Sequence, residues 1–283
     1  MSTVMISGAS SGIGEALAKE FATGGNDLIL VARSADKLER LAQQLEAENQ
    51  VQVWVEPADL ARRGAAKKLA AAVRDRDLEV DILVNCAGVL EHGHFARIPA
   101  KTHQSLIDLN ISGLTTMLSY FLPPMIERGR GRVLNVASIA AYQPVPSLAT
   151  YAATKAYVLS LSESLSEELA GTGVTVTALC PGFTATNMVS TAQEKSRGLK
   201  IPDFMIAEVE DVAAQVIPEM DKGALFIDGS TAGVACAHRV AEIAKANGVR
   251  AIDAPVSGGL GGAQAATLTF MVGGDKADFD ACQ

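Results

Sequence analysis

The sequence predicts an α/β fold in which helices cover both faces of a doubly wound parallel sheet, giving three layers. One observation behind this prediction is that short apolar runs alternate with helical patterns from the start of the chain, which is typical of βαβ units. A second is that runs such as Leu-Ile-Leu-Val at 28–31 are apolar at every position, as strands buried on both faces must be.

The predicted elements alternate in order along most of the chain. Strands are expected at 4–7, 27–32, 51–55, 81–85, 131–138 and 174–179, and helices at 12–23, 34–49, 65–74, 102–128 and 151–170. The helix at 34–49, for example, repeats leucine at helical spacing with charged residues between. Pro123 and Pro124 are expected to disturb the end of the segment at 102–128, which is predicted as one bent helix or two helices.

The composition excludes several classes of protein. The 283 residues carry a formal charge of −8, from 24 Lys and Arg against 32 Asp and Glu, and 48% of them are hydrophobic. This apolar fraction is too high for a disordered chain, and the acidic balance argues against nucleic acid as a partner. No apolar stretch reaches the roughly 20 residues of a membrane helix, and the start of the chain lacks the basic flank of a signal peptide. The length fits one large domain or one and a half ordinary ones.

The cysteines indicate a reducing environment. Cys86, Cys180, Cys236 and Cys282 are scattered, with no C-x-x-C pair among them. Neither a zinc site nor a disulfide framework is therefore expected, and a cytoplasmic location fits this usage.

A glycine-rich loop joins the first strand to the first helix and predicts a dinucleotide site. The loop reads Ser-Gly-Ala-Ser-Ser-Gly-Ile-Gly at 7–14. Its glycines permit a tight turn, a close approach of the backbone to a pyrophosphate and close packing of the helix on the sheet. Free N–H groups at the start of the helix then face the phosphates, as in a Rossmann-type fold. The loop residues expected to contact the cofactor are Gly8, Ser10, Ser11, Gly12, Ile13 and Gly14.

The end of the second strand bears on the choice between NADP(H) and NAD(H). An acidic residue at this position would bind the ribose hydroxyls of the adenosine and repel a 2′-phosphate. The chain has Ala32 there, followed by Arg33, whose guanidinium suits a phosphate. NADP(H) is therefore expected rather than NAD(H), although Arg33 is also a residue that a solvated helix start could carry.

Three residues form a candidate catalytic set. Tyr151 and Lys155 share one face of a predicted helix, and Ser138 ends the fifth predicted strand. Tyrosine normally ionises near pH 10, and a neighbouring ammonium together with an oriented cofactor would lower the pKa of Tyr151. A tyrosine tuned in this way can give a proton to a carbonyl oxygen or take one from an alcohol, while Ser138 hydrogen-bonds the same oxygen.

Together these residues resemble the short-chain dehydrogenase/reductase family over about residues 3–215. The resemblance rests on motifs that occur in the order of the family. They are Gly8-x-x-x-Gly12-x-Gly14, Asp59-Leu60, Asn85-Cys86-Ala87-Gly88, Asn110, Ser138, Tyr151-x-x-x-Lys155 and Pro181-Gly182. One small departure is Ser7, where the family usually has threonine, and it keeps the hydroxyl group.

The resemblance implies a role for each of these residues. Tyr151 is expected to be the acid/base, and Ser138 to polarise the substrate oxygen. Lys155 is expected to bind the nicotinamide ribose and shift Tyr151, with Asn110 holding a water of the proton relay behind it. The other residues implied in cofactor binding are Asp59, Leu60, Asn85, Ala87, Gly88, Pro181, Gly182, Thr184 and Thr186, of which Thr186 is expected at the carboxamide.

The last part of the chain resembles a different family, the 3-hydroxyisobutyrate-type β-hydroxyacid dehydrogenases, over roughly residues 218–283. The similarity covers the Ser-Gly-Gly segment at 257–259, which in that family binds the substrate carboxylate. The G-x-G-x-x-G loop of that family is absent, and its catalytic lysine would follow residue 283. We therefore expect a fused sequence, with a domain at 1–220 and a partial α/β extension at 221–283. The strand expected at 224–228 is a candidate for the last strand of the first domain's sheet, with residues 234–247 packed outside it.

These observations predict an NADP(H)-dependent oxidoreductase that interconverts a carbonyl and a secondary alcohol. The irregular segment at 181–210 is expected to be a substrate lid. The family resemblance implies a homodimer or homotetramer, with a small molecule as the other partner. Two alternatives stay open at this point, a dinucleotide-binding protein without turnover and a 3-hydroxy acid dehydrogenase.

Overall fold

The structure, a computed structural model, describes residues 2–182, 184, 208–210, 212–214 and 217, and the backbone of four short strands beyond them. The chain divides into two compact units, Met1–Val216 and Ile217–Gln283. Among the helices that the structure describes, none combines the length and apolarity needed to cross a lipid bilayer. The substrate lid expected at 181–210 and the helix expected at 234–247 lie almost wholly outside the described residues.

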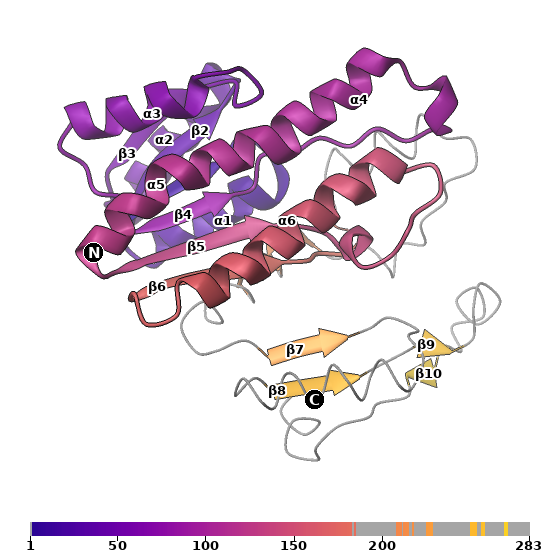
Figure 1. The fold of residues 1–283 in the computed structure, drawn as a ribbon. Helices are drawn as coiled ribbons and strands as arrows, with labels where there is room; N and C mark the ends of the chain where they lie inside the picture. Colours follow the sequence, from indigo (N-terminus) through magenta and orange to yellow (C-terminus); the bar gives the residue numbers. More distant parts are fainter. Residues whose placement is uncertain are drawn as a thin grey trace. The chain divides into compact units, whose positions relative to one another are not determined.

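The first unit is built on a parallel sheet of six strands (Figure 1). The strands are β1 (Thr3–Ser7), β2 (Asp27–Ala32), β3 (Val53–Pro57), β4 (Ile82–Asn85), β5 (Gly131–Val136) and β6 (Val174–Leu179). Their order is β3-β2-β1-β4-β5-β6, so the chain runs outward from β1 to one edge and then from β4 to the other. The reversal between β1 and β4 is the switch point at which doubly wound sheets bind their ligands. This confirms the predicted Rossmann-type α/β fold.

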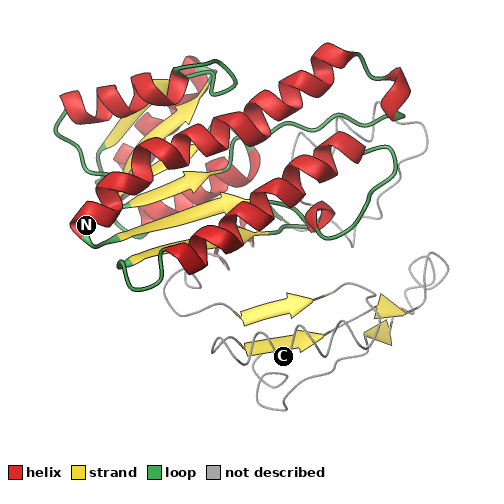
Figure 2. Cartoon of the chain, viewed as in Figure 1, coloured by secondary structure: helices red, strands yellow, loops and turns green. Residues whose placement is uncertain are grey.

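Helices cover both faces of this sheet, which Figure 2 shows as three layers. One face carries α1 (Gly12–Thr23) and α2 (Ala35–Asn49). The other carries α3 (Ala65–Asp75), α5 (Leu114–Arg128) and α6 (Ala149–Glu168). The shorter helical elements are η1 (Phe95–Arg97), α4 (Ala100–Ile107), the π-helical η2 (Asp108–Gly113) and η3 (Ile139–Ala141).

The core follows from the two-residue period of the strands. Met5 of β1 and Leu83 of β4 lie in one buried cluster with Met117 and Phe121 of α5. The alternate strand residues face the other way, where the buried side of α1 includes Leu17. Both faces of the central strands are therefore sealed from water, which explains why their sequences are apolar at every position.

Several boundaries differ from the predicted ones; for example, β5 ends at Val136 rather than at 138, and α6 runs from Ala149 to Glu168 rather than over 151–170. The third strand begins at Val53 rather than at 51, because Gln50 ends α2 in a left-handed conformation and the chain must turn before it can pair. Pro123 and Pro124 lie inside α5, which continues to Arg128, so the expectation that they disturb its end is wrong. The carbonyl groups that lose their partners, four residues earlier, belong to exposed residues, where water can satisfy them.

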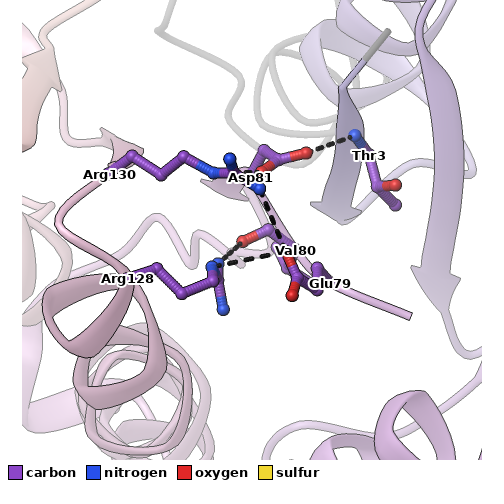
Figure 3. Close-up of polar contacts among 6 residues, drawn as sticks. All are labelled: Thr3, Glu79, Val80, Asp81, Arg128 and Arg130. Atoms are coloured by element: carbon purple, nitrogen blue, oxygen red, sulfur yellow. Dashed lines mark hydrogen bonds and ion pairs between the residues drawn. The ribbon is translucent and has the colours of Figure 1, made fainter. Parts of the chain in front are cut away.

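Ion pairs and hydrogen bonds join the amino ends of the strands (Figure 3). Asp81, just before β4, accepts a hydrogen bond from the Thr3 backbone N–H at 3.0 Å. Glu79 pairs with both Arg128 and Arg130, at 3.6 and 3.1 Å. These ion pairs are largely exposed, and each contributes at most about 1 kcal/mol to stability. Together with the hydrogen bond of Asp81, they join β1, the start of β4 and the end of α5 at the amino ends of the strands, on the side of the sheet opposite the switch point.

The second unit contains β7 (Leu225–Asp228), which pairs in parallel with β8 (Arg250–Asp253), and β9 (Val256–Ser257), which pairs with β10 (Thr269–Phe270) in an antiparallel manner. The segment between β7 and β8 is long enough for the crossover that parallel strands need. The strand near 224–228, predicted to join the first unit's sheet, is β7, which the structure pairs with β8 in a two-stranded sheet. The expected substrate loop at 257–259 lies outside the described residues after Ser257.

Because β7 pairs within the second unit, we expect a chain truncated after Asp221 to keep the thermal unfolding midpoint of the first unit, measured by circular dichroism. A chain truncated after Glu168 is the control and should not fold, since it loses β6 and the buried Val174 and Val176. If truncation after Asp221 also abolishes folding, the segment beyond it does complete the first sheet.

Candidate active site

A cavity of about 460 Å³ lies where the carboxyl ends of the parallel strands meet. Its walls come from the segments that follow β1 to β6. Most residues predicted to form the site lie on these walls, namely Gly8, Ser10, Ser11, Gly12, Ile13, Arg33, Asp59, Leu60, Ala87, Gly88, Ser138, Tyr151, Lys155, Pro181, Gly182 and Thr184. Gly14, Asn85 and Asn110 are not on the cavity wall, and Thr186 lies outside the described residues.

The loop between β1 and α1 depends on two of its glycines. Gly8 has a φ of +76°, and a side chain there would bring its Cβ within 2.9 Å of the Ala87 backbone. A Cβ on Gly14 would lie 2.4 Å from the Gly8 carbonyl oxygen. Gly14 thus acts by letting the first turn of α1 lie against the loop, which leaves the N–H groups of the helix start facing the cavity. These groups fit a pyrophosphate.

The Ser7 hydroxyl group fixes the loop after β4. It accepts hydrogen bonds from the N–H groups of Cys86 and Ala87, at 3.1 and 3.2 Å, and donates one to the Val84 carbonyl at 3.2 Å. The side chain is buried, so these backbone groups have no water to replace it. Any β-hydroxyl residue can make these bonds, which explains why serine serves here in place of threonine.

Asn85 points under the cavity rather than into it. Its amide donates to Asn135 Oδ1 at 2.9 Å, and the Asn135 amide donates to Ser162 Oγ at 3.0 Å. This buried chain crosses from β4 through β5 to α6. The expectation that the Asn85 side chain lines the cofactor cleft is therefore not met. Asn85 instead holds the floor of the site to the helix that carries Tyr151.

Asn110 lies in the π-helical turn between α4 and α5. Its Oδ1 accepts from the Val89 N–H at 2.9 Å, and its Nδ2 donates to the Val89 carbonyl at 2.9 Å and to Thr154 Oγ1 at 3.0 Å. These bonds tie the loop after β4 to α6. Gly88 separates this amide from the ammonium of Lys155, since a Cβ on Gly88 would lie 3.4 Å from Asn110 Oδ1 and 3.5 Å from Lys155 Nζ. A proton relay through Asn110 stays a prediction.

Ser138, Tyr151 and Lys155 meet on one wall of the cavity, and all three are buried. Ser138 Oγ accepts from the Ala140 N–H at 3.1 Å, which leaves its own proton for the side-chain hydrogen bond with Tyr151. Lys155 Nζ donates to the Val136 carbonyl at 2.7 Å and lies 5.8 Å from the centre of the Tyr151 ring. The sequence prediction that these residues converge agrees with this geometry.

Burial dominates the ionisation of this group. It lowers the pKa of Lys155 to about 8, against a weaker opposing effect of Cys86 and Cys180. It raises the pKa of Tyr151 above its ordinary value, although the hydrogen bond with Ser138 acts to lower it. A lowering of the Tyr151 pKa by Lys155 together with an oriented cofactor stays a prediction.

At the other end of the cavity, the wall is lined by Ala32, which ends β2, and by Arg33 and Ser34, which follow it. The Arg33 side chain is exposed and makes no ion pair with the part of the chain that the structure describes. It is thus available to an anionic group bound at this end.

Comparison with known proteins gives the family. The model of the short chain dehydrogenase family matches residues 2–197. The chain belongs to this family. An uncharacterised oxidoreductase of Staphylococcus haemolyticus is 39% identical over 184 residues, which make up 65% of this chain and 78% of that protein.

Solved structures of short-chain dehydrogenases share the fold. A short-chain dehydrogenase from Sphingobium yanoikuyae in complex with NADPH is 34% identical, with a TM-score of 0.72, over 78% of this chain and 85% of that chain. L-Sorbose reductase from Gluconobacter frateurii, complexed with NADPH and L-sorbose, is 28% identical, with a TM-score of 0.71, over 77% and 89% of the two chains. This short-chain dehydrogenase is thus an oxidoreductase with a nucleotide cofactor.

A second family model, the NAD binding domain of 6-phosphogluconate dehydrogenase, matches residues 152–283. This confirms the resemblance of the last part of the chain to a different family of dehydrogenases. The two matched regions overlap on α6 and β6, so the same residues are compatible with both families.

Several residues on the cavity wall were not predicted from the sequence. They are apolar or small, and include Val89, Leu90, Ile139, Ala140, Val145 and Leu148, together with Gln143. No motif marks them. Their one signal is position, because each lies within a few residues of a predicted strand end or of Tyr151.

The depressed pKa of Lys155 gives a test by stability. Between pH 8 and the ordinary value of 10.5, the unfolded chain holds a proton that the folded chain has released, so stability rises with pH. We expect the unfolding free energy of the wild type to increase relative to Lys155→Met between pH 7.5 and pH 9, by at most about 1.4 kcal/mol per pH unit. Urea unfolding at several pH values measures this. A constant difference would mean that Lys155 keeps its ordinary pKa.

Proposed function

We propose that the chain catalyses the NADP(H)-dependent interconversion of a carbonyl compound and a secondary alcohol. The observation that carries this proposal is the buried set of Ser138, Tyr151 and Lys155 on the wall of a cavity that begins at the glycine-rich loop. NADPH is present in the solved structures from Sphingobium yanoikuyae and Gluconobacter frateurii, which supports the choice of cofactor. Binding without turnover would leave this buried set of polar groups without a purpose.

The residues fit a phosphorylated dinucleotide. The open turn at Gly8 and the start of α1 suit the pyrophosphate, and Arg33 beside the neutral Ala32 suits a 2′-phosphate. When bound, the nicotinamide supplies or accepts the hydride. Asp59 and Leu60, after β3, would contact the adenine, and Lys155 would contact the nicotinamide ribose.

The chain's own residues handle the substrate oxygen and its proton. The Tyr151 hydroxyl gives a proton to the oxygen during reduction and takes one back during oxidation. Its raised pKa keeps it in the protonated, donating form at neutral pH. Ser138 orients Tyr151 and can hydrogen-bond the same oxygen. Lys155 stays mainly protonated at pH 7, and its bond to Val136 uses one of its three protons, so two are left for other partners.

We also propose that the protein is a homodimer or homotetramer that associates through α5 and α6. The support is that these helices expose large apolar and aromatic side chains, Tyr120 and Ile126 on α5 and Tyr157 on α6.

Replacing the proposed acid tests the function directly. Tyr151→Phe removes the proton donor, and we expect kcat for carbonyl reduction with NADPH to fall by about 100- to 10,000-fold, while NADPH binding is kept. Tyr157→Phe makes the same change at an exposed position of the same helix and should leave kcat unchanged. Absorbance of NADPH over a panel of ketones measures turnover. Full activity in Tyr151→Phe would contradict the mechanism, and tight NADPH binding without turnover in the wild type would favour the binding-protein alternative.

The role of Arg33 predicts a change in cofactor choice. Arg33→Ala removes a charge-assisted contact with the 2′-phosphate, so we expect the Kd for NADPH to rise by about 10- to 100-fold and the Kd for NADH to stay the same. Fluorescence titration with both cofactors measures the two constants. Lys37→Ala is the control, because Lys37 is an exposed cation of α2 that does not line the cavity. An equal loss for both cofactors would show that Arg33 does not read the 2′-phosphate.

A further inference from the structure

The cavity has an apolar end around the proposed acid. Val89 and Leu90 of the loop after β4 and Val145 and Leu148 of the segment before α6 pack in one cluster with Tyr151. All of these residues also line the cavity, so they present apolar atoms to whatever lies beside the phenol. Ile139 adds a further apolar side chain from the loop after β5.

The apolar side chains of this end carry no charge, and the charged residues of the described lining are Arg33, Asp59 and Lys155. Arg33 and Asp59 follow β2 and β3, at the dinucleotide end, and Lys155 lies beside Tyr151 with its ammonium bonded to the Val136 carbonyl. Besides Ser138 and Tyr151, the described lining on the segments after β5 and β6 has two more polar side chains, the neutral Gln143 and Thr184. A carboxylate brought there would lose its hydration with no cation among these residues to replace it.

Hydrogen bonds hold the two sides of the apolar end together. The Gly93 N–H donates to the Ser147 carbonyl at 2.9 Å. The His103 ring bridges the same two segments, since its Nε2 lies 3.2 Å from the Phe95 carbonyl oxygen and its Nδ1 lies 2.8 Å from Thr150 Oγ1. The two segments that carry the apolar side chains are therefore joined by hydrogen bonds of the protein itself, without a bound substrate.

From this arrangement we propose that the substrate is a neutral ketone with an apolar, ring-sized or branched group beside the carbonyl, and not a keto acid or a 3-hydroxy acid. The proposal rests on the function proposed above and names the substrate class of the same site. Burial of apolar surface against Val145 and Leu148 would supply the affinity, and Tyr151 with Ser138 would fix the oxygen.

A matched pair of probes separates the two classes. Ethyl benzoylformate and benzoylformate share the phenyl ketone and differ in that the second carries a carboxylate. We expect kcat/KM with NADPH to be at least about 100-fold higher for the ester, because the acid must bury an unpaired charge. Comparable values, or a preference for the acid, would overturn the proposal while leaving the oxidoreductase function in place.

Binding to an inactive variant makes the test independent of turnover. Tyr151→Phe saturated with NADPH should still bind ethyl benzoylformate, measured by ligand-observed NMR, and should not bind benzoylformate. If the ester binds and no variant or wild type reduces it, the apolar site stands and the proposed activity fails. If the acid binds as well as the ester, the inferred substrate class is wrong.

Adding a cation to the apolar end should reverse the preference. Leu148→Arg and Val145→Arg each place a guanidinium on the wall at a half-buried position, and we expect kcat/KM for benzoylformate to rise by about 10-fold or more while the value for the ester falls. Ala149→Arg is the control, since Ala149 is exposed, adjacent in sequence and not on the wall. If both wall variants fold and neither gains activity on the acid, or if Ala149→Arg gains as much, the wall does not set the substrate class.

Discussion

The parallel direction of the six strands is the constraint on which this site depends. In a parallel sheet the carboxyl ends of all strands lie on the same side, so the loop after each strand reaches the same region. Residues as distant in sequence as Gly8, Asp59, Tyr151 and Thr184 meet there for that reason. The ion pairs of Glu79 and Asp81 lie at the amino ends of the strands, and the cavity lies at the carboxyl ends.

Buried polar side chains hold these loops in place. Ser7 fixes the loop after β4 to β1, Asn110 fixes it to α6, and Asn85 connects the floor to α6 through Asn135. Each of these amides and hydroxyls satisfies backbone or side-chain groups that would otherwise be buried without partners, so their loss is costly. The wall that carries Tyr151 is thus stabilised by the buried hydrogen bonds of these polar residues and by the apolar cluster around Tyr151.

The sequence was sufficient for the fold and for much of the site. The strand at 174–179 and the helix at 12–23 were predicted at their observed bounds, because apolar runs and glycine signals are local. Convergence of Ser138, Tyr151 and Lys155 followed from motif order. By contrast, the start of β3 depended on the left-handed Gln50, which no pattern at 50–55 signals.

The orientation of individual side chains and their degree of burial could not be predicted from the sequence. The spacing of Asn85 places it at the edge of the cavity, but its orientation toward β5 depends on Asn135, a partner distant in the chain. The pKa of Tyr151 depends on burial, which a motif does not encode. The apolar residues that surround Tyr151, such as Leu90 and Leu148, belong to loops without motifs and gather only in the folded chain.

The π-helical turn at Asp108–Gly113 has a consequence for how this helix can evolve. A π turn is equivalent to one residue inserted into an α-helix, and each added residue rotates the remainder of the helix by about 100°. Before the turn, Leu106 faces the cluster around Tyr151, and after it, Met117 faces the sheet. The π turn takes up its extra residue locally, so the helix before it can face the cluster around Tyr151 while the helix after it faces the sheet. Deleting a single residue from the turn would restore a regular helix and keep both of these faces, whereas a residue inserted elsewhere in α5 without such a turn would rotate everything after it.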